Sequence, residues 1–170
     1  VLRDVPSFRD MISIQTKAGI CLDSGPEGSN TYNLSKEYLL KSVEESLKRL
    51  GTGYIDRFLL HRPDPLIEPN EIAEAFRIMK ERGMVREFGV SNMSAAQIKL
   101  LNASLDEPIG VNQIQLSLGH AGLLDAGVTV NDLSSPSGPG LFGLLEYCRL
   151  HNISVQTWGS LDRGLYASGL

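Results

Sequence analysis

Short apolar, β-branched runs alternate along the chain with longer stretches in which apolar residues recur at a helical period. The apolar runs predict five strands, at residues 11–17, 54–61, 85–92, 109–117 and 153–161. The stretches between them predict helices at residues 35–51, 69–83, 94–104 and 140–152. Because a helix lies in every gap between strands, the pattern predicts parallel strands joined by helical crossovers.

Polar residues at the ends of the helical stretches set the predicted boundaries. Ser35 stands where an N-cap is expected and Gly51 where the first helix should stop. Ser94 and Gln97 have the spacing of a capping box. The first helix carries one apolar face, composed of Leu40, Val43, Leu47 and Leu50.

Two architectures fit alternating strands and helices, a doubly wound open sheet and a (β/α) barrel. No GxGxxG follows any predicted strand, which argues against a classical dinucleotide-binding sheet. The strands begin apolar and end polar, as in a barrel whose chemistry lies at its C-terminal face. We therefore predict an α/β fold of the (β/α)8 TIM-barrel type, incomplete, with about five β/α units in one partial domain over residues 1–170.

A complete barrel needs eight units and roughly 250 residues. The missing strands are expected outside this sequence, or from a partner, or the fold is an open variant. The chain begins at Val1 without an initiator Met, so we expect a piece of a longer chain. Open sheet edges would favour self-association.

Composition excludes several classes of protein. The 170 residues are 42% hydrophobic and 21% charged, as in an ordinary globular domain. The net charge of −4 and the lack of a basic stripe argue against nucleic acid or a membrane surface as partner. No apolar run approaches the ~20 residues of a membrane span, and the first residues lack the layout of a signal peptide. Cys21 and Cys148 have no metal or redox spacing, so a reduced cytoplasmic protein is expected.

Polar side chains gather where the predicted strands end, and in a parallel barrel those ends meet at one mouth. The side chains expected there are Lys17, His61, Arg62, Ser91, Asn92, Asn112, Gln113, Gln115, Trp158 and Ser160. This set suits a flat polar ring bearing an amide, next to a carbonyl to be polarised. It does not suit a metal, because the three histidines are scattered and no carboxylates have ligand spacing.

Each of these residues also has a purely structural interpretation. Lys17 could be a solvated lysine, and His61 could cap the turn made by the following Arg-Pro-Asp. Residues 91–92 could form only the turn before the next helix. Gln113 could hydrogen-bond within the barrel interior, and Trp158 could belong to the core. Within "FLLHRPDP", Arg62 and Asp64 are interpreted as supporting or turn-forming groups.

Four segments together resemble the aldo-keto reductases, NAD(P)H-dependent carbonyl reductases on a (β/α)8 barrel. They are "YIDRFLLHRPDP" (54–65), "KERGMVREFGVSN" (80–92), "VNQIQLS" (111–117) and "VQTWGSL" (155–161). The resemblance is closest to the bacterial-type branch with a His-Arg-Pro-Asp segment. It covers nearly the whole chain, and it implies that the five strands are the third to the seventh of the barrel.

The resemblance implies a role for each matching residue. Lys17 matches the lysine that assists a catalytic tyrosine, and His61 matches the histidine that orients the carbonyl oxygen. Ser91, Asn92 and Gln113 match the residues that hydrogen-bond the nicotinamide carboxamide, and Trp158 matches the aromatic that stacks on the ring. The segment that holds the cofactor pyrophosphate is matched by Gly159, Ser160 and Leu161.

Two parts of the family pattern are missing from this sequence. The catalytic Asp and Tyr would lie upstream of Val1, and the eighth-strand region that grips the adenosine is absent. NADP(H) is therefore favoured over NAD(H) only as the family default. The implied activity is reduction of a small aldehyde or ketone to an alcohol. The alternative is a catalytically inactive, truncated or degenerate barrel that serves as a nucleotide-binding or interaction module. Residues 118–139 either shape the substrate pocket or form a flexible insertion.

Overall fold

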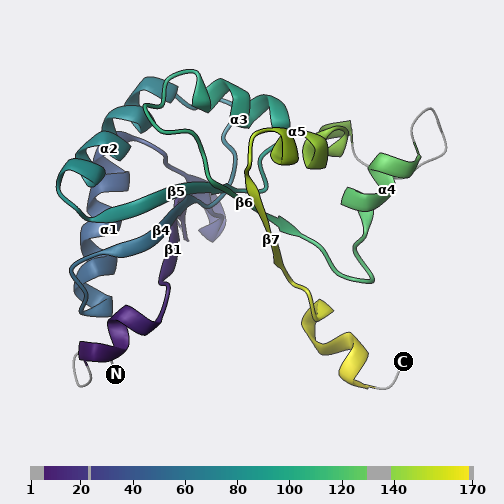
Figure 1. The fold of residues 1–170 in the computed structure, drawn as a ribbon, viewed down its shortest axis with the longest axis horizontal. Helices are drawn as coiled ribbons and strands as arrows, with labels where there is room; N and C mark the ends of the chain where they lie inside the picture. The colour runs from purple at the N-terminus through teal and green to yellow at the C-terminus, as the bar shows by residue number, and fades with distance from the viewer. Residues whose placement is uncertain (1–5, 23, 130–138, 169–170) are drawn as a thin grey trace.

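Five parallel strands form a curved sheet in the computed structural model, which describes residues 6–22, 24–129 and 139–168 (Figure 1). The strands lie in the order β1-β4-β5-β6-β7. Their bounds are Gln15–Ala18 for β1, Ile55–Leu60 for β4, Val85–Ser91 for β5, Val111–Gln115 for β6 and Ser154–Trp158 for β7. Every neighbouring pair is parallel, which confirms the predicted crossover topology.

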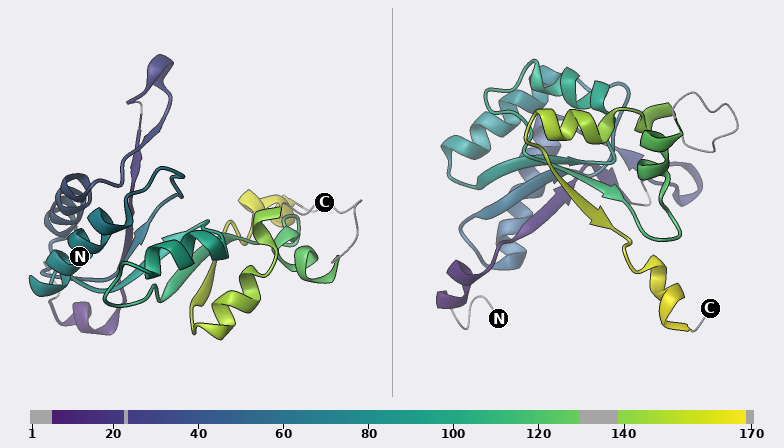
Figure 2. Two further views of the ribbon diagram at one scale, coloured as in Figure 1. Left: turned by 90° about the horizontal axis from the view of Figure 1, so that it is seen from above. Right: turned by 45° about the vertical axis from the view of Figure 1, so that its right-hand side comes forward.

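Four helices cover one face of this sheet, as the views in Figures 1 and 2 show. They are α1 (Lys36–Leu50), α2 (Pro69–Glu81), α3 (Ala95–Asn102) and α5 (Leu144–Leu150). The main core lies between sheet and helices, with Phe58, Phe88 and Val90 of the sheet buried against residues such as Ile72 and Phe76 of α2. Side chains alternate across a strand, so the other face of the sheet, which is concave (Figure 1), carries the intervening side chains, among them Arg57, Glu87 and Gln113.

The capping signals in the sequence are confirmed. Ser35 accepts a hydrogen bond from the Tyr38 N–H, and Gly51 ends α1 with φ 67°. Ser94 and Gln97 form the predicted capping box at the start of α3.

The predicted apolar face of α1 is confirmed in part, because Val43 is buried and Leu40 and Leu47 pack against the core. The buried residues are Leu39, Val43 and Ser46, whereas Leu50 is 38% exposed. Ser46 can be buried because its hydroxyl donates to the Ser42 carbonyl one turn earlier, at 2.8 Å.

Several elements were not predicted. A two-stranded antiparallel hairpin, β2 (Ile20–Cys21) with β3 (Thr31–Tyr32), projects from the loop after β1 (Figure 2). The short helix α4 (Gly122–Val128) lies within residues 118–139, where no helix was predicted, and residues 130–138 lie outside the described residues. α5 begins later than predicted, because Gly143 adopts φ 68° after the 3-10 turn η3 (Pro139–Leu141).

Three further 3-10 segments lie before β1, between β2 and β3, and after β7. They are η1 (Pro6–Met11), η2 (Pro26–Gly28) and η4 (Asp162–Ser168). The first predicted strand therefore starts four residues later than expected, since residue 11 still belongs to η1 and β1 begins at residue 15. No helix in the described ranges is both long enough and apolar enough to span a bilayer.

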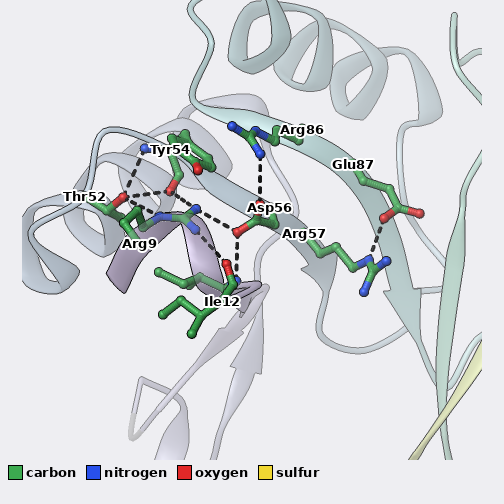
Figure 3. Close-up of polar contacts among 9 residues, drawn as sticks. Arg9, Ile12, Thr52, Tyr54, Asp56, Arg57, Arg86 and Glu87 are labelled. Atoms are coloured by element: carbon green, nitrogen blue, oxygen red, sulfur yellow. Dashed lines mark hydrogen bonds and ion pairs between the residues drawn. The ribbon is translucent and has the colours of Figure 1, made fainter. Parts of the chain in front are cut away.

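A polar network fixes η1 to the N-terminal end of the sheet, opposite the polar strand ends (Figure 3). The Arg9 guanidinium pairs with the Asp56 carboxylate at 2.7 Å and donates to the Thr52 hydroxyl at 2.9 Å and to the Tyr54 carbonyl at 3.1 Å. The same Asp56 oxygen accepts the Ile14 N–H at 2.8 Å. The network thus joins the segment before β1 to the start of β4.

Candidate active site

The C-terminal ends of the strands bring most of the predicted site residues to one rim. The parallel register places Lys17 beside Leu59 and Ser91 beside Gln113. The His61 N–H donates to the Ala18 carbonyl at 2.8 Å, which holds the end of β4 against β1. A cleft of about 160 Å³ at this rim is lined by Lys17, His61, Arg62, Ser91, Asn92 and Trp158.

Lys17 is half-buried, and the amide of Gln113 holds its ammonium. Its Nζ donates to Gln113 Oε1 at 2.5 Å. Gln113 Nε2 in turn donates to Gln156 Oε1 at 3.2 Å, and that oxygen also accepts Gln15 Nε2 at 2.8 Å. Gln113 therefore hydrogen-bonds inside the concave face, as its structural interpretation predicted, and it also positions the Lys17 ammonium. Its contact with a cofactor stays a prediction.

Burial and like charges shift the titration of the two predicted catalytic groups. Burial lowers the pKa of Lys17 below its ordinary value, and the Arg62 charge lowers it further. Burial also lowers the pKa of His61, as do the charges of Lys17 and Arg62. Both effects favour the neutral imidazole of His61, which has one N–H donor and one acceptor nitrogen.

A chain of hydrogen bonds connects the end of β5 to the indole on β7. Ser91 is 1% exposed, and its hydroxyl donates to the Gln113 carbonyl at 3.0 Å. Asn92 Nδ2 donates to Ser91 Oγ at 2.8 Å, and Asn92 Oδ1 accepts Trp158 Nε1 at 3.0 Å. Asn92 has φ 58°, a left-handed conformation that asparagine tolerates. Residues 91–92 thus do more than form a turn, and they hold Trp158 half-buried at the cleft instead of in the core.

Arg62, which was expected at the rim and interpreted as a supporting or turn-forming group, also lines the cleft. Its guanidinium carbon lies 5.6 Å from the centroid of the Trp158 ring. The prediction for Asp64 is confirmed, since its carboxylate accepts the Leu66 N–H two residues later and forms the turn. The sequence could not show that Arg62 and Asp64 have different roles, because both residues follow the end of the same strand.

Asn112 does not lie at the rim. It is fully buried on the helix side of the sheet, where its Nδ2 donates to the Met93 carbonyl at 2.9 Å. Strand alternation explains the error, because its neighbours on β6, Gln113 and Gln115, occupy the opposite face.

The turn after β7 lies outside the cleft. Gly159 has φ 68°, and Gly159, Ser160 and Leu161 are all exposed. The hydroxyls of Thr157 and Ser160 are 2.7 Å apart, and the Asp162 N–H donates to the Gly159 carbonyl at 2.8 Å. The predicted contact of this turn with a pyrophosphate stays a prediction.

A second cleft, of about 300 Å³, shares Arg62, Asn92 and Trp158 with the first. It extends toward α4 and α5, and its apolar wall is composed of Met93, Ile114, Leu123, Leu141 and Leu144. Within the described ranges, no group of three or more histidine, cysteine or carboxylate side chains could hold a metal ion. The arrangement can therefore bind a polar ring, with hydrogen-bonding groups and cations on one side and apolar surface on the other.

Comparisons with known proteins agree with this arrangement. A model of the aldo/keto reductase family matches residues 1–169. The uncharacterized oxidoreductase YcsN of Bacillus subtilis (strain 168) is 49% identical over 164 residues, which are 94% of this chain and 49% of that protein.

Solved structures give the same result for the fold. An aldo-keto reductase from Bacillus halodurans, in its holo form, matches with a TM-score of 0.70 and 28% identity, over 96% of this chain and 48% of that chain. A glycerol dehydrogenase from Gluconobacter oxydans matches with a TM-score of 0.73 and 25% identity, over 99% of this chain and 46% of that one. The chain spans about half the length of the proteins it matches, which agrees with the predicted incomplete barrel.

Proposed function

The chain belongs to the aldo/keto reductase family, and from this premise we propose that it forms the central part of a barrel that reduces an aldehyde or ketone to an alcohol with a nicotinamide cofactor. The observation that carries the proposal is the single cleft that contains an ammonium, a neutral imidazole, an amide and an indole, contributed by Lys17, His61, Asn92 and Trp158. The ends of four separate strands contribute these groups, which could polarise a carbonyl and hold a nicotinamide ring beside it.

The side chains at the rim fit a nicotinamide ring in their chemistry. Trp158 offers an aromatic surface held in place by Asn92, and Asn92 Nδ2 has a second N–H beyond the one given to Ser91. Ser91 and Gln113 would hold the Asn92 amide in place through their hydrogen bonds. The pyrophosphate would be bound by Gly159, Ser160 and Leu161. When bound, the reduced nicotinamide would supply the hydride to the carbonyl carbon. NADP(H) is proposed over NAD(H) on the family resemblance alone.

The chain's own residues would act on the carbonyl oxygen and on the proton donor. The neutral imidazole of His61 would donate its N–H to the carbonyl oxygen, on which negative charge develops. Lys17, held by Gln113, would place its ammonium beside the donor hydroxyl and lower the pKa of that hydroxyl. By the family resemblance the donor is a tyrosine upstream of Val1, so turnover would require both parts of the barrel.

NADPH oxidation in the presence of 4-nitrobenzaldehyde tests the proposal. We expect the 170-residue chain to turn over poorly and a chain extended upstream, through the expected Asp and Tyr, to oxidise NADPH when aldehyde is added. Equal rates from the two chains would show that the role given to the upstream tyrosine is wrong.

Variants of the extended chain test the residues named here. Lys17→Met and His61→Ala should each lower kcat by roughly 10²- to 10⁴-fold, as expected for loss of a group that assists proton transfer. Lys41→Met, at an exposed position on α1, is the matched control and should retain full activity. An extended chain that binds NADPH but reduces no aldehyde would instead support the non-catalytic nucleotide-binding alternative.

A further inference from the structure

Arg62 is a cation at the rim for which the described residues supply no carboxylate. Among those residues no hydrogen bond or ion pair engages its guanidinium, and its contact is with the Trp158 ring. Elsewhere in the described part of the chain, arginines such as Arg57 and Arg77 pair with carboxylates, at 2.5 and 3.2 Å. Arg62 is therefore placed differently from these arginines, at the edge of the candidate active site.

The charge of the rim is opposite to that of the chain. The chain carries a net charge of −4, yet Lys17 and Arg62 line one cleft with the neutral His61. None of the ion pairs within the described ranges involves Lys17 or Arg62. Two like charges held close together repel, and an anion bound between them or beside them offsets that repulsion. The rim is thus complementary to a negative group on a bound molecule.

The position of Arg62 matches a role beside the reacting carbonyl. It directly follows His61, and it lines the 160 Å³ cleft, the 300 Å³ cleft and a third cleft of about 400 Å³ beside the β2–β3 hairpin. A substrate whose carbonyl oxygen is near His61 would have its substituent within reach of these spaces. The guanidinium carbon lies 5.6 Å from the centroid of the Trp158 ring, within cation–π range, and Arg62 is only partly exposed.

We propose that Arg62 determines substrate specificity by binding a carboxylate or phosphate group of the carbonyl substrate. The inference rests on the proposed function and narrows its substrates to carbonyl compounds with an anionic group, such as oxo acids or phosphorylated aldehydes. The planar guanidinium binds either group through two parallel N–H···O bonds.

The fluorescence of Trp158, the single tryptophan in the chain, reports on this site without any turnover. The chain is titrated at constant ionic strength with 4-oxobutanoate, with butanal, which has the same carbon chain without the carboxylate, and with inorganic phosphate. We expect a saturable change in emission with 4-oxobutanoate and none with butanal over the same range. Competition by phosphate would extend the site to phosphorylated carbonyl compounds, and lack of competition would assign it to carboxylates.

Variants separate recognition from folding. Arg62→Gln should weaken 4-oxobutanoate binding roughly tenfold to a hundredfold, because a charge-assisted contact is lost. Arg62→Lys should retain part of the affinity, and Arg77→Gln, at an exposed arginine on α2, should retain all of it. Circular dichroism would check that each variant is folded.

Equal binding of 4-oxobutanoate and butanal, or unchanged binding in folded Arg62→Gln, would overturn the inference. The proposed function is judged separately, by quenching of Trp158 with NADPH in the same variant. NADPH binding that persists while carboxylate selectivity is missing would refute only the role of Arg62.

Discussion

Replacing Asp56 by asparagine removes the negative charge that fixes η1 to the start of β4 (Figure 3). One carboxylate oxygen accepts both the Arg9 guanidinium at 2.7 Å and the Ile14 N–H at 2.8 Å. The side chains of Arg9 and Asp56 are only 11% and 16% exposed, so solvent screens this ion pair weakly. The guanidinium of Arg86 lies farther away, 3.4 Å from the other oxygen, and is 62% exposed.

These contacts determine how much free energy of unfolding Asp56→Asn should lose. Breaking a buried ion pair by removing one partner costs roughly 3–5 kcal/mol. Arg9 keeps acceptors on Thr52, Ile12 and Tyr54, and its guanidinium stays 3.7 Å from the Tyr54 ring. We therefore expect a smaller loss of about 2–3 kcal/mol in the free energy of unfolding, comparable with one charge-assisted hydrogen bond. For a chain of this length, that loss lowers Tm by roughly 4–12 °C.

The loss of stability in Asp56→Asn should become smaller as the pH falls. Burial raises the pKa of Asp56, but the Ile14 N–H and the charge and hydrogen bonds of Arg9 outweigh it, so the pKa lies below its ordinary value. The stabilisation is therefore complete above the ordinary pKa of an aspartate, and it is lost as the pH falls through the lowered value in the folded state. The difference between the wild type and Asp56→Asn should accordingly shrink in acid.

Urea unfolding followed by circular dichroism measures this difference, and Glu87→Gln is the matched control. Glu87 pairs with Arg57 at 2.5 Å in the same region, but both side chains are 38% exposed (Figure 3). The control should lose at most about 1 kcal/mol, as exposed ion pairs do. Equal losses from the two variants, or a difference that does not shrink in acid, would refute this reasoning about burial.

Three further measurements test other parts of the structure. An NMR titration should give His61 a pKa below that of a free imidazole, and Lys17→Met should raise it by removing a nearby positive charge. Ser94→Ala should destabilise the chain by about 1 kcal/mol in urea unfolding, because the capping box of α3 is lost. Gly89→Ala should lower stability by roughly 1–3 kcal/mol, because its added Cβ would lie 2.9 Å from the backbone oxygen of Val111 on the neighbouring strand.

The sequence predicted the sheet and its helices well because local signals coincide with long-range packing. Apolar runs mark the strands, and Ser35, Gly51 and Ser94 mark helix ends through bonds to residues three or four positions away. Ser46 was missed from the buried face of α1 because serine looks polar in the sequence, whereas its hydroxyl bonds within its own helix. The β2–β3 hairpin was missed because its two-residue strands are too short to show alternation.

The site was predictable in its residue types but not in its contacts. Strand ends converge in a parallel sheet, so Lys17, His61 and Trp158 could be placed at one rim from their positions alone. The bonds from Asn92 to Trp158 and from Lys17 to Gln113 depend on register and rotamer, which the sequence pattern does not contain.

Asn112 and Arg62 also show that the contacts of a residue cannot be predicted from its position in the sequence. Asn112 was assigned to the rim because it lies beside Gln113 in the sequence, yet it faces the helices. Arg62 was expected at the rim but interpreted as a supporting group, and its place in the wall of the cleft depends on backbone geometry after β4 that the sequence pattern does not contain.

The most direct test of the whole account is a titration of the chain with NADPH, followed by energy transfer from the indole of Trp158 to the reduced nicotinamide. The account predicts saturable quenching of Trp158 with sensitised emission from the cofactor, and weaker binding in Asn92→Ala, which removes the amide beside the indole. Absence of energy transfer at saturating NADPH, or binding that Asn92→Ala leaves unchanged, would contradict the claim that these strand ends form one cofactor site.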